Sequence, residues 1–268
     1  MLSILKPIEF KWNFLYARVD TIHRIMNFAI AKSLLKKTAI IASIIGGFFI
    51  VNIISSQIAQ AQNNVPPNTL VFPVDSKPYG KSYSEWSAIW WQWLLSIPKD
   101  ASPAGDSTGK NCGTNQEGPI WFLAGTFGGA AQRTCTIPSG KAIMFSPINS
   151  ECSYAEYPDE KTESDLLECA KTFQDQTTFA QVTINGTAIE NLDKFRIQSP
   201  PFNVTFPENN VFGISPGPTQ AVSDGLWVIL KPLPLGEHKI GFKGISVDFT
   251  TGAKNTFVSD ATYNVIVK

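Results

Sequence analysis

The strongest hydrophobic pattern in the chain is an apolar run over residues 38–54, which follows Lys36-Lys37 and precedes Ala59-Gln60-Ala61. Two cations, an apolar core and small residues at positions −3 and −1 are the features of a secretory signal that is cut after residue 61. The pattern therefore predicts export and places residues 62–268 outside the cytoplasm.

Two features of this leader leave alternatives open. The first 25 residues resemble neither a signal nor a domain, and Met26 opens a signal of more usual length, so Met26 is a candidate start. Residues 38–54 are also just long enough to remain as an uncleaved membrane anchor. In both cases the cations keep the preceding end in the cytoplasm, and the rest of the chain lies across the membrane.

A second pattern, of helical period, follows a polar, proline-bearing linker at residues 62–77. Ser82 and Glu85 have the spacing of a capping box, and Pro98 ends the pattern. One face of this helix is apolar and is made of Trp86, Ile89, Trp90, Trp93, Leu94 and Ile97. We expect this tryptophan-rich amphipathic helix to pack on a sheet, with Trp91 pointing the other way.

From residue 118 the pattern changes to short apolar or alternating runs separated by Gly, Pro, Asn and Asp. The expected strands are 119–124, 141–147, 179–184, 195–198, 202–206, 226–231, 238–243 and 261–267. Asn185-Gly186 predicts a hairpin turn, and residues 162–173 predict a helix. The spacing indicates one mainly β domain over residues 78–268, with antiparallel strands folded as a sandwich or barrel.

Two segments carry a resemblance. Residues 233–242 together with 263–268 resemble the last two strands of extracellular immunoglobulin-like or jelly-roll-like sandwiches. With the tryptophan-rich helix and residues 199–210 and 216–225, the exported part is similar to a group of secreted prokaryotic β-sandwich proteins without an assigned function. This resemblance implies an antiparallel sandwich and an extracytoplasmic location, and it implies no activity or site residues.

All four cysteines lie in the exported part, which favours disulfides. Of the three connectivities we prefer Cys112–Cys135 with Cys152–Cys169. The chain lacks a C-x-x-C pair, and the exported part has the single histidine His238, so the sequence predicts no metal site and no cofactor.

The net charge of the exported part limits the classes of partner that it is expected to bind. Seven of the 22 Lys and Arg residues, and two of the 22 Asp and Glu residues, precede residue 62, so the exported part carries 15 cations and 20 anions, a formal charge of −5. Because phosphate binding requires clustered cations, nucleic acid is not an expected partner. A glycan or another envelope protein is expected instead, with membrane contact only through residues 38–54 if they stay uncleaved.

Catalytic motifs are weak. Residues 213–217 match G-x-S-x-G, with Asp224 and His238 following in the order of an α/β-hydrolase. Pro216 follows the serine, however, and lacks the backbone N–H that such a site requires for its oxyanion hole. His238 remains the one imidazole that catalysis in the exported part could use.

A pair of acids is the other catalytic candidate. Glu151 and Glu156 lie five residues apart, and they are either solvated loop carboxylates or the pair of a carbohydrate hydrolase. Trp91 and Tyr83 are candidate aromatic contacts for a glycan or a protein partner. We expect a binding or structural envelope module, with an extracytoplasmic carbohydrate hydrolase as the alternative.

Overall fold

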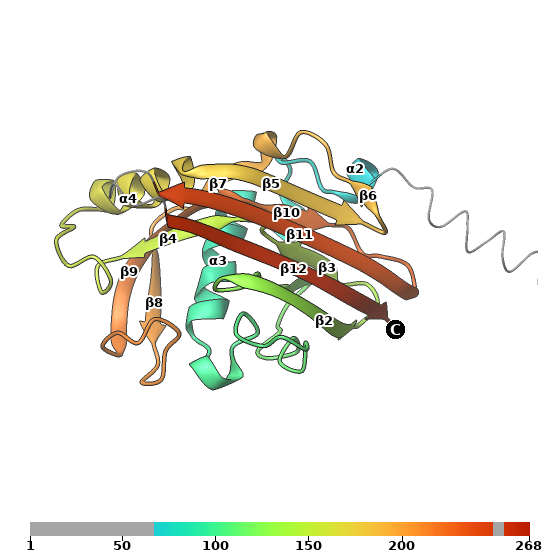
Figure 1. The fold of residues 1–268 in the computed structure, drawn as a ribbon, viewed down its shortest axis with the longest axis horizontal. Helices are drawn as coiled ribbons and strands as arrows, with labels where there is room; N and C mark the ends of the chain where they lie inside the picture. Colours follow the sequence, from blue (N-terminus) through green and yellow to red (C-terminus); the bar gives the residue numbers. More distant parts are fainter. Residues whose placement is uncertain (1–66, 249–254) are drawn as a thin grey trace, which may run out of the picture. The chain divides into compact units, whose positions relative to one another are not determined.

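The computed structural model describes residues 67–248 and 255–268 (Figure 1). The expected signal or anchor at 38–54 and the first part of the linker lie outside these residues. The described part is mainly β, with strands gathered in three sheets. None of its helices is long and apolar enough to cross a membrane.

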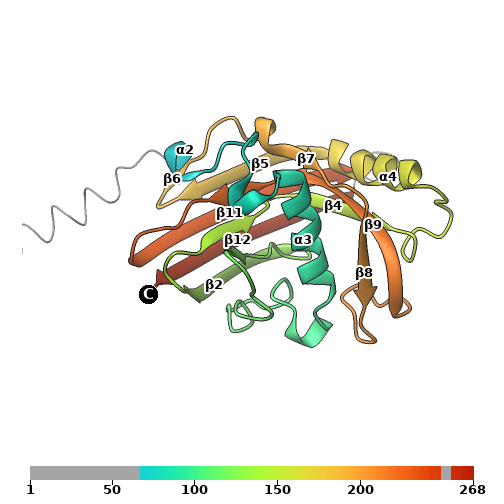
Figure 2. The same cartoon turned by 180° about the vertical axis from the view of Figure 1, so that it is seen from behind.

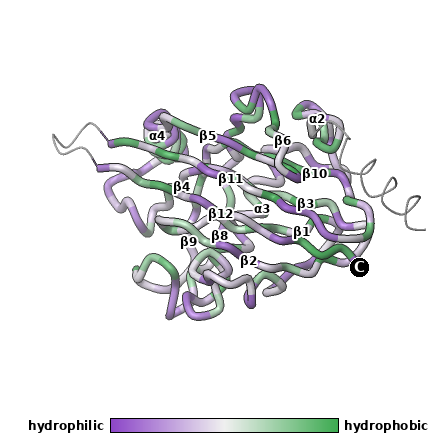
Figure 3. Tube along the Cα trace, turned by 45° about the vertical axis from the view of Figure 1, so that its right-hand side comes forward, coloured by the Kyte–Doolittle hydropathy of each residue, from purple (hydrophilic) through white to green (hydrophobic). Residues whose placement is uncertain are grey.

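The largest sheet has five strands in the order β2-β12-β11-β5-β6. Their bounds are β2 (Gly129–Ile137), β12 (Asn255–Val267), β11 (Gly236–Asp248), β5 (Thr177–Ile184) and β6 (Thr187–Ala188). Hydrophobic and hydrophilic positions alternate along these strands (Figure 3), so one side of the sheet faces the core. The predicted hairpin turn is confirmed, since Asn185 and Gly186 join β5 to β6 with φ of 51° and 83°.

The other two sheets are smaller. One has the order β1-β3-β10, with β1 (Ile120–Phe122), β3 (Ala142–Phe145) and β10 (Val228–Leu230). The other has the order β4-β9-β7, with β4 (Asn149–Ser153), β9 (Gly217–Leu226) and β7 (Arg196–Gln198), and β8 (Phe202–Phe206) also pairs with β9.

Two strand pairs correct the expectation of an all-antiparallel fold. β1 pairs with β3 in parallel, and β12 pairs with β2 in parallel. Parallel neighbours need a long connection, and here the chain between β1 and β3 passes through β2 in a different sheet. The short turns along the chain therefore do not imply that each strand pairs with the next.

Helix α3 (Tyr83–Leu95) carries four of the tryptophans. Its N-terminus has a complete capping box, because Ser82 Oγ accepts from the Glu85 backbone N–H and Glu85 accepts from the Ser82 backbone N–H. Seen from the side opposite to Figure 1, α3 crosses in front of the strands (Figure 2). Helix α4 (Glu163–Asp175) has the same length as α3. The shorter helices are α2 (Pro67–Leu70), η1 (Pro78–Gly80), η2 (Lys99–Ala101) and η3 (Leu192–Phe195).

The three-stranded sheet lies between two apolar cores. Ala142 and Met144 of β3 share one core with the tryptophans of α3. Ile143 and Phe145 share the other core with the five-stranded sheet, where Phe145 stacks on Phe242 with ring centroids 4.7 Å apart. A strand that is buried on both faces reads as a continuous apolar run, which is why the sequence located β3.

Both expected disulfides are confirmed, Cys112–Cys135 and Cys152–Cys169. The first joins the loop before β1 to β2. The second joins β4 to α4, whose N-terminus has a capping box of Thr162 and Asp165. The second disulfide therefore fixes α4 beside the strand that carries Glu151.

Arg133 of β2 is fully buried and makes five hydrogen bonds to groups outside its own strand. Its guanidinium donates to the carbonyl oxygens of Ala104, Asp106, Ala124 and Gly125 and to the Tyr263 hydroxyl, at 2.6 to 3.0 Å. The residue thus joins the long loop before β1 and the β1–β2 connection to the five-stranded sheet.

Candidate functional site

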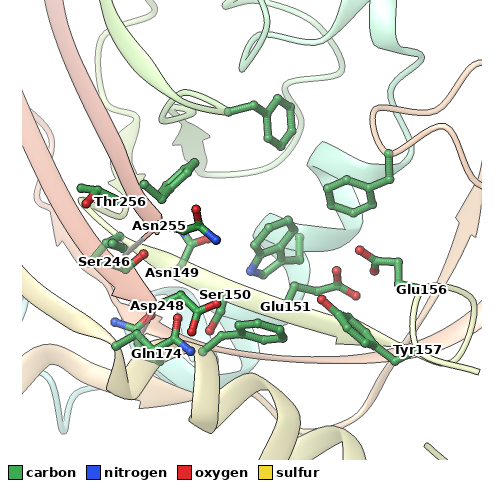
Figure 4. A pocket seen from close by; sticks show the side chains of 17 residues that line it. Asn149, Ser150, Glu151, Glu156, Tyr157, Gln174, Ser246, Asp248, Asn255 and Thr256 are labelled. Carbon is green, nitrogen blue, oxygen red and sulfur yellow. The ribbon is translucent and has the colours of Figure 1, made fainter. Parts of the chain in front are cut away.

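A cleft of about 460 Å³ opens where several segments distant in the sequence meet (Figure 4). Its walls come from α3, β4 and the turn after it, α4, the end of β11 and the start of β12. Phe127, after β1, and Phe212, after β8, complete the lining, with ring centroids 6.1 Å apart.

Aromatic rings form much of this lining. Trp91 and Tyr157 are the larger ones, and Phe127, Phe173 and Phe257 are unusual because each remains exposed to solvent by about 40% or more. The Trp91 indole N–H is buried and lacks a hydrogen-bond partner among the described residues. Exposed rings gathered around one concavity favour contact with a ligand.

Amide and hydroxyl side chains fill the spaces between the rings. They are Asn149, Ser150, Gln174, Gln176, Ser246, Asn255 and Thr256. In Figure 4, Ser246, Asn255 and Thr256 lie at one end of the cleft, and Glu151, Glu156 and Tyr157 lie at the other. The cleft therefore combines apolar surfaces with many neutral hydrogen-bonding groups.

The charged groups of the lining are all acidic. Glu151, Glu156 and Asp248 line the cleft, and none of its described lining residues is Lys, Arg or His. Arg196 of β7 does not line the cleft and forms ion pairs with Asp224 at 3.0 Å and Asp175 at 2.7 Å. The cleft therefore does not favour an anionic ligand such as a phosphate.

Glu151 is the most unusual group in the site. It lies on β4, is only 7% exposed, and neither carboxyl oxygen has a hydrogen-bond partner among the described residues. Burial raises its pKa well above the ordinary glutamate value, and the nearby carboxyl of Glu156 raises it further. Figure 4 shows the two carboxyl groups turned toward each other.

Glu156 and Tyr157 follow β4 in a turn that brings them back to Glu151. The Ser153 hydroxyl donates to Glu156 at 2.7 Å. Burial nevertheless raises the pKa of Glu156, and burial together with the two acids raises the pKa of Tyr157. Because two adjacent buried carboxyls do not both ionise readily, the pair holds a proton at a higher pH than isolated glutamates do.

Only some of the site residues predicted from the sequence lie in this cleft. It brings Glu151, Glu156 and Trp91 to one cleft. Tyr83 lies elsewhere, buried, and its hydroxyl donates to the Phe72 carbonyl at 2.7 Å. His238, at the start of β11, contacts the Pro234 carbonyl at 2.8 Å and does not line the cleft.

Several lining residues were not among the sequence candidates. Phe173 and Gln174 come from α4, and Asn255 and Thr256 come from the start of β12. Phe127 does have a local sequence signal, because it is an aromatic residue in a glycine-rich segment that is typical of a turn. A turn does not require an aromatic side chain, so its presence indicates another role. The other four lie in ordinary amphipathic patterns.

Among the described residues, no group of three or more His, Cys, Asp or Glu side chains is arranged to hold a metal ion. Comparisons with protein-family models, with curated proteins and with solved structures found no match for this chain.

The raised pKa of Glu151 predicts an unusual dependence of stability on pH. Since the folded state binds this proton more tightly than the unfolded state, the associated stability is fully present below the ordinary glutamate pKa. It is lost as pH rises through the raised folded pKa, at about 1.4 kcal/mol for each unit of pKa difference. Glu151→Gln stays uncharged, so its free energy of unfolding is expected to fall less between pH 4.5 and pH 8.

Urea denaturation at the two pH values measures this difference. Glu168→Gln is the matched control, because Glu168 is exposed on α4 and does not line the cleft. Equal pH dependence in the wild type and in Glu151→Gln would contradict the assignment.

Proposed function

We propose that the protein is an exported, disulfide-stabilised, β-rich binding protein whose cleft holds a ligand of the saccharide class. The observation that carries this proposal is the lining of the cleft, in which exposed aromatic rings alternate with neutral amide and hydroxyl groups. A saccharide has the matching surface, since its ring faces are apolar C–H groups and its edges are hydroxyl groups.

The size and charge of the cleft support the same class of ligand. A volume of about 460 Å³ is within the range of small-molecule sites, roughly 300–1,000 Å³. The absence of Lys, Arg and His from its described lining argues against anionic ligands. The unpartnered Trp91 N–H is a donor that a hydroxyl or ring oxygen of the ligand would satisfy.

Export is supported by the two disulfides and by the leader. Disulfides form and persist in oxidising compartments, and both pairs here close without leaving a free cysteine in the described part. We place the cleft on the extracytoplasmic side of the membrane, where free and cell-wall glycans are both accessible, and we propose an antiparallel-rich sandwich arrangement for the sheets that carry it.

The binding prediction concerns Phe257. Titration of the protein with neutral oligosaccharides, followed by calorimetry and by tryptophan fluorescence, is expected to identify a binder. Phe257→Ala is then expected to weaken binding by about 5- to 30-fold, because it removes a ring worth about 1–2 kcal/mol of ligand contact.

Phe179→Ala is the matched control. Both rings lie on the five-stranded sheet and are similarly exposed, 40% for Phe257 and 42% for Phe179, but Phe179 does not line the cleft. A neutral panel that neither variant nor wild type binds, or equal losses in the two variants, would count against a saccharide site in this cleft.

A hydrolase is the second candidate function, and one observation favours it. Glu151 and Glu156 are adjacent acids with raised pKa values, and such a pair can divide into a general acid and a base. Release of reducing ends from an oligosaccharide, lost in both Glu151→Gln and Glu156→Gln while binding persists, would assign this activity. Binding without turnover would leave the binding function alone.

A further inference from the structure

One end of the cleft carries the carboxyl groups of Glu151 and Glu156, and a neutral sugar does not require two acidic groups. We propose that Glu151 and Glu156 form a subsite for an ammonium group, so that the ligand is an amino sugar. This inference rests on the proposed saccharide-binding function and specifies one substituent of the ligand.

The first argument is the missing partner of Glu151. Its side chain is more than nine-tenths buried in the wall of the cleft, and both carboxyl oxygens lack a hydrogen-bond donor among the described residues. In the free protein, the proton that the pair holds is the one donor available between Glu151 and Glu156. Once both carboxyls are ionised they only accept, so a buried pair of this kind requires donors from a ligand.

The second argument is charge. The groups that face Glu151 are the Glu156 carboxyl and the Tyr157 hydroxyl from the same turn. None of the described lining residues is cationic. Arg196 of β7, which does not line the cleft, is paired with Asp224 and Asp175. A cation from the ligand would therefore be attracted by the Glu151–Glu156 pair and repelled by none of the described lining residues.

The third argument is the shape of the donor set. An ammonium group has three N–H donors, and this end of the cleft offers acceptors on Glu151, Glu156 and the Tyr157 hydroxyl, which Figure 4 shows close together. Trp91 and Tyr157 also line the cleft, and aromatic faces attract cations. A neutral hydroxyl donates one hydrogen bond and would leave most of these acceptors unsatisfied.

Ammonium binding also makes a distinctive prediction about protons. The free pair holds a proton because of burial and mutual repulsion, and a bound cation favours the ionised form of the pair instead. Binding of the amine therefore releases protons, and affinity rises with pH until the amine itself deprotonates. A neutral sugar that covers the pair has the opposite effect, because further burial strengthens proton binding.

The test uses three tetrasaccharides that share one β-1,4-linked backbone and differ at carbon 2, which carries a hydroxyl, an acetamido or an ammonium group. Calorimetry is done on the exported domain with intact disulfides at pH 5 and pH 6.5, each in two buffers of different ionisation enthalpy. We expect the amine to bind about 10- to 100-fold more tightly than the hydroxyl analogue at pH 6.5, the effect of one or two charge-assisted hydrogen bonds. We also expect that binding of the amine releases protons and that binding of the hydroxyl and acetamido analogues does not.

Glu151→Gln and Glu156→Gln are each expected to abolish most of this preference for the amine over the hydroxyl analogue. Glu168→Gln is the control, since it changes the net charge equally and lies outside the cleft, so it is expected to keep the preference. Circular dichroism confirms that each variant is folded.

The outcomes separate the two proposals. Equal binding of all three ligands, or a preference for the acetamido form, would overturn the ammonium subsite and leave the saccharide site in place. An amine preference that Glu168→Gln reduces as much as Glu151→Gln would be a general charge effect and would also overturn the subsite. A failure of all three ligands to bind would overturn both proposals.

Discussion

Arg133→Met is expected to lower the free energy of unfolding by about 3–5 kcal/mol, which is a large part of the stability of a domain of this size. The substitution keeps much of the side-chain volume but removes all five hydrogen bonds of the guanidinium. Carbonyl oxygens from the two connections around β1, together with the Tyr263 hydroxyl, would then lose a buried donor.

Urea denaturation measures this loss of stability. Two further variants on β2 test whether the lost hydrogen bonds cause it. Arg133→Lys keeps the charge but cannot reach several carbonyls with a planar fork, so it is also expected to be destabilised by 2 kcal/mol or more. Gln132→Met introduces the same methionine at the neighbouring exposed position and is expected to change stability by less than about 0.5 kcal/mol. A loss below about 1 kcal/mol for Arg133→Met would contradict the assigned role.

The second large effect is expected from the disulfides. The two bridges close chain segments of 23 and 17 residues, and each is expected to stabilise the fold by about 3 kcal/mol in the chain-entropy account. Replacing both members of one pair by alanine is therefore expected to lower the free energy of unfolding by about that amount. Loss of both bridges approaches the total stability of many domains.

Urea denaturation with and without a thiol reductant checks this expectation. The wild type is expected to unfold at much lower urea in the reductant. A variant that lacks both cysteine pairs serves as the control, because the reductant should not affect it. A wild type whose midpoint is unchanged by full reduction would show that packing alone maintains the fold.

Local signals explain which elements could be predicted from the sequence. The capping box of Ser82 and Glu85 and the turn at Asn185-Gly186 act within a few residues, so the bounds of α3 and of the β5–β6 hairpin follow from them. β3 was found because both of its faces are buried. The disulfide pairs join cysteines that are neighbours along the chain, which was the simplest of the three connectivities.

Long-range pairing explains what could not be predicted. β2 contains Arg133 at a buried position, and an arginine in an alternating pattern normally indicates the exposed face. β9 begins with Gly217-Pro218 and buries Ser223 and Asp224, so its composition is typical of a loop. The missed positions carry polar groups whose partners lie on distant segments, and these partners are not visible in a local pattern.

The residues of the candidate site also fall into those that local sequence signals predict and those that depend on long-range pairing. Glu151 and Glu156 were found because they are close in sequence and of one chemical type. Gln174 and Asn255 reach the cleft only through the disulfide-fixed position of α4 and the pairing of β11 with β12. Tyr83 was a candidate for its aromatic ring, but the ring faces the interior because its hydroxyl finds a backbone acceptor there.

The position of β12 in the five-stranded sheet has a consequence for how the chain reaches its folded state. β12 lies between β2 and β11, and its parallel pairing joins Gly129 to Ser259. A chain that is synthesised from its N-terminus therefore presents β2 long before the strand that pairs with it. Until β12 follows, the edge of β2 lacks its neighbouring strand, and the Arg133 guanidinium lacks one of its five partners, the Tyr263 hydroxyl. Emergence of β2 and completion of the five-stranded sheet are thus separate in time, and the second waits for the final strand.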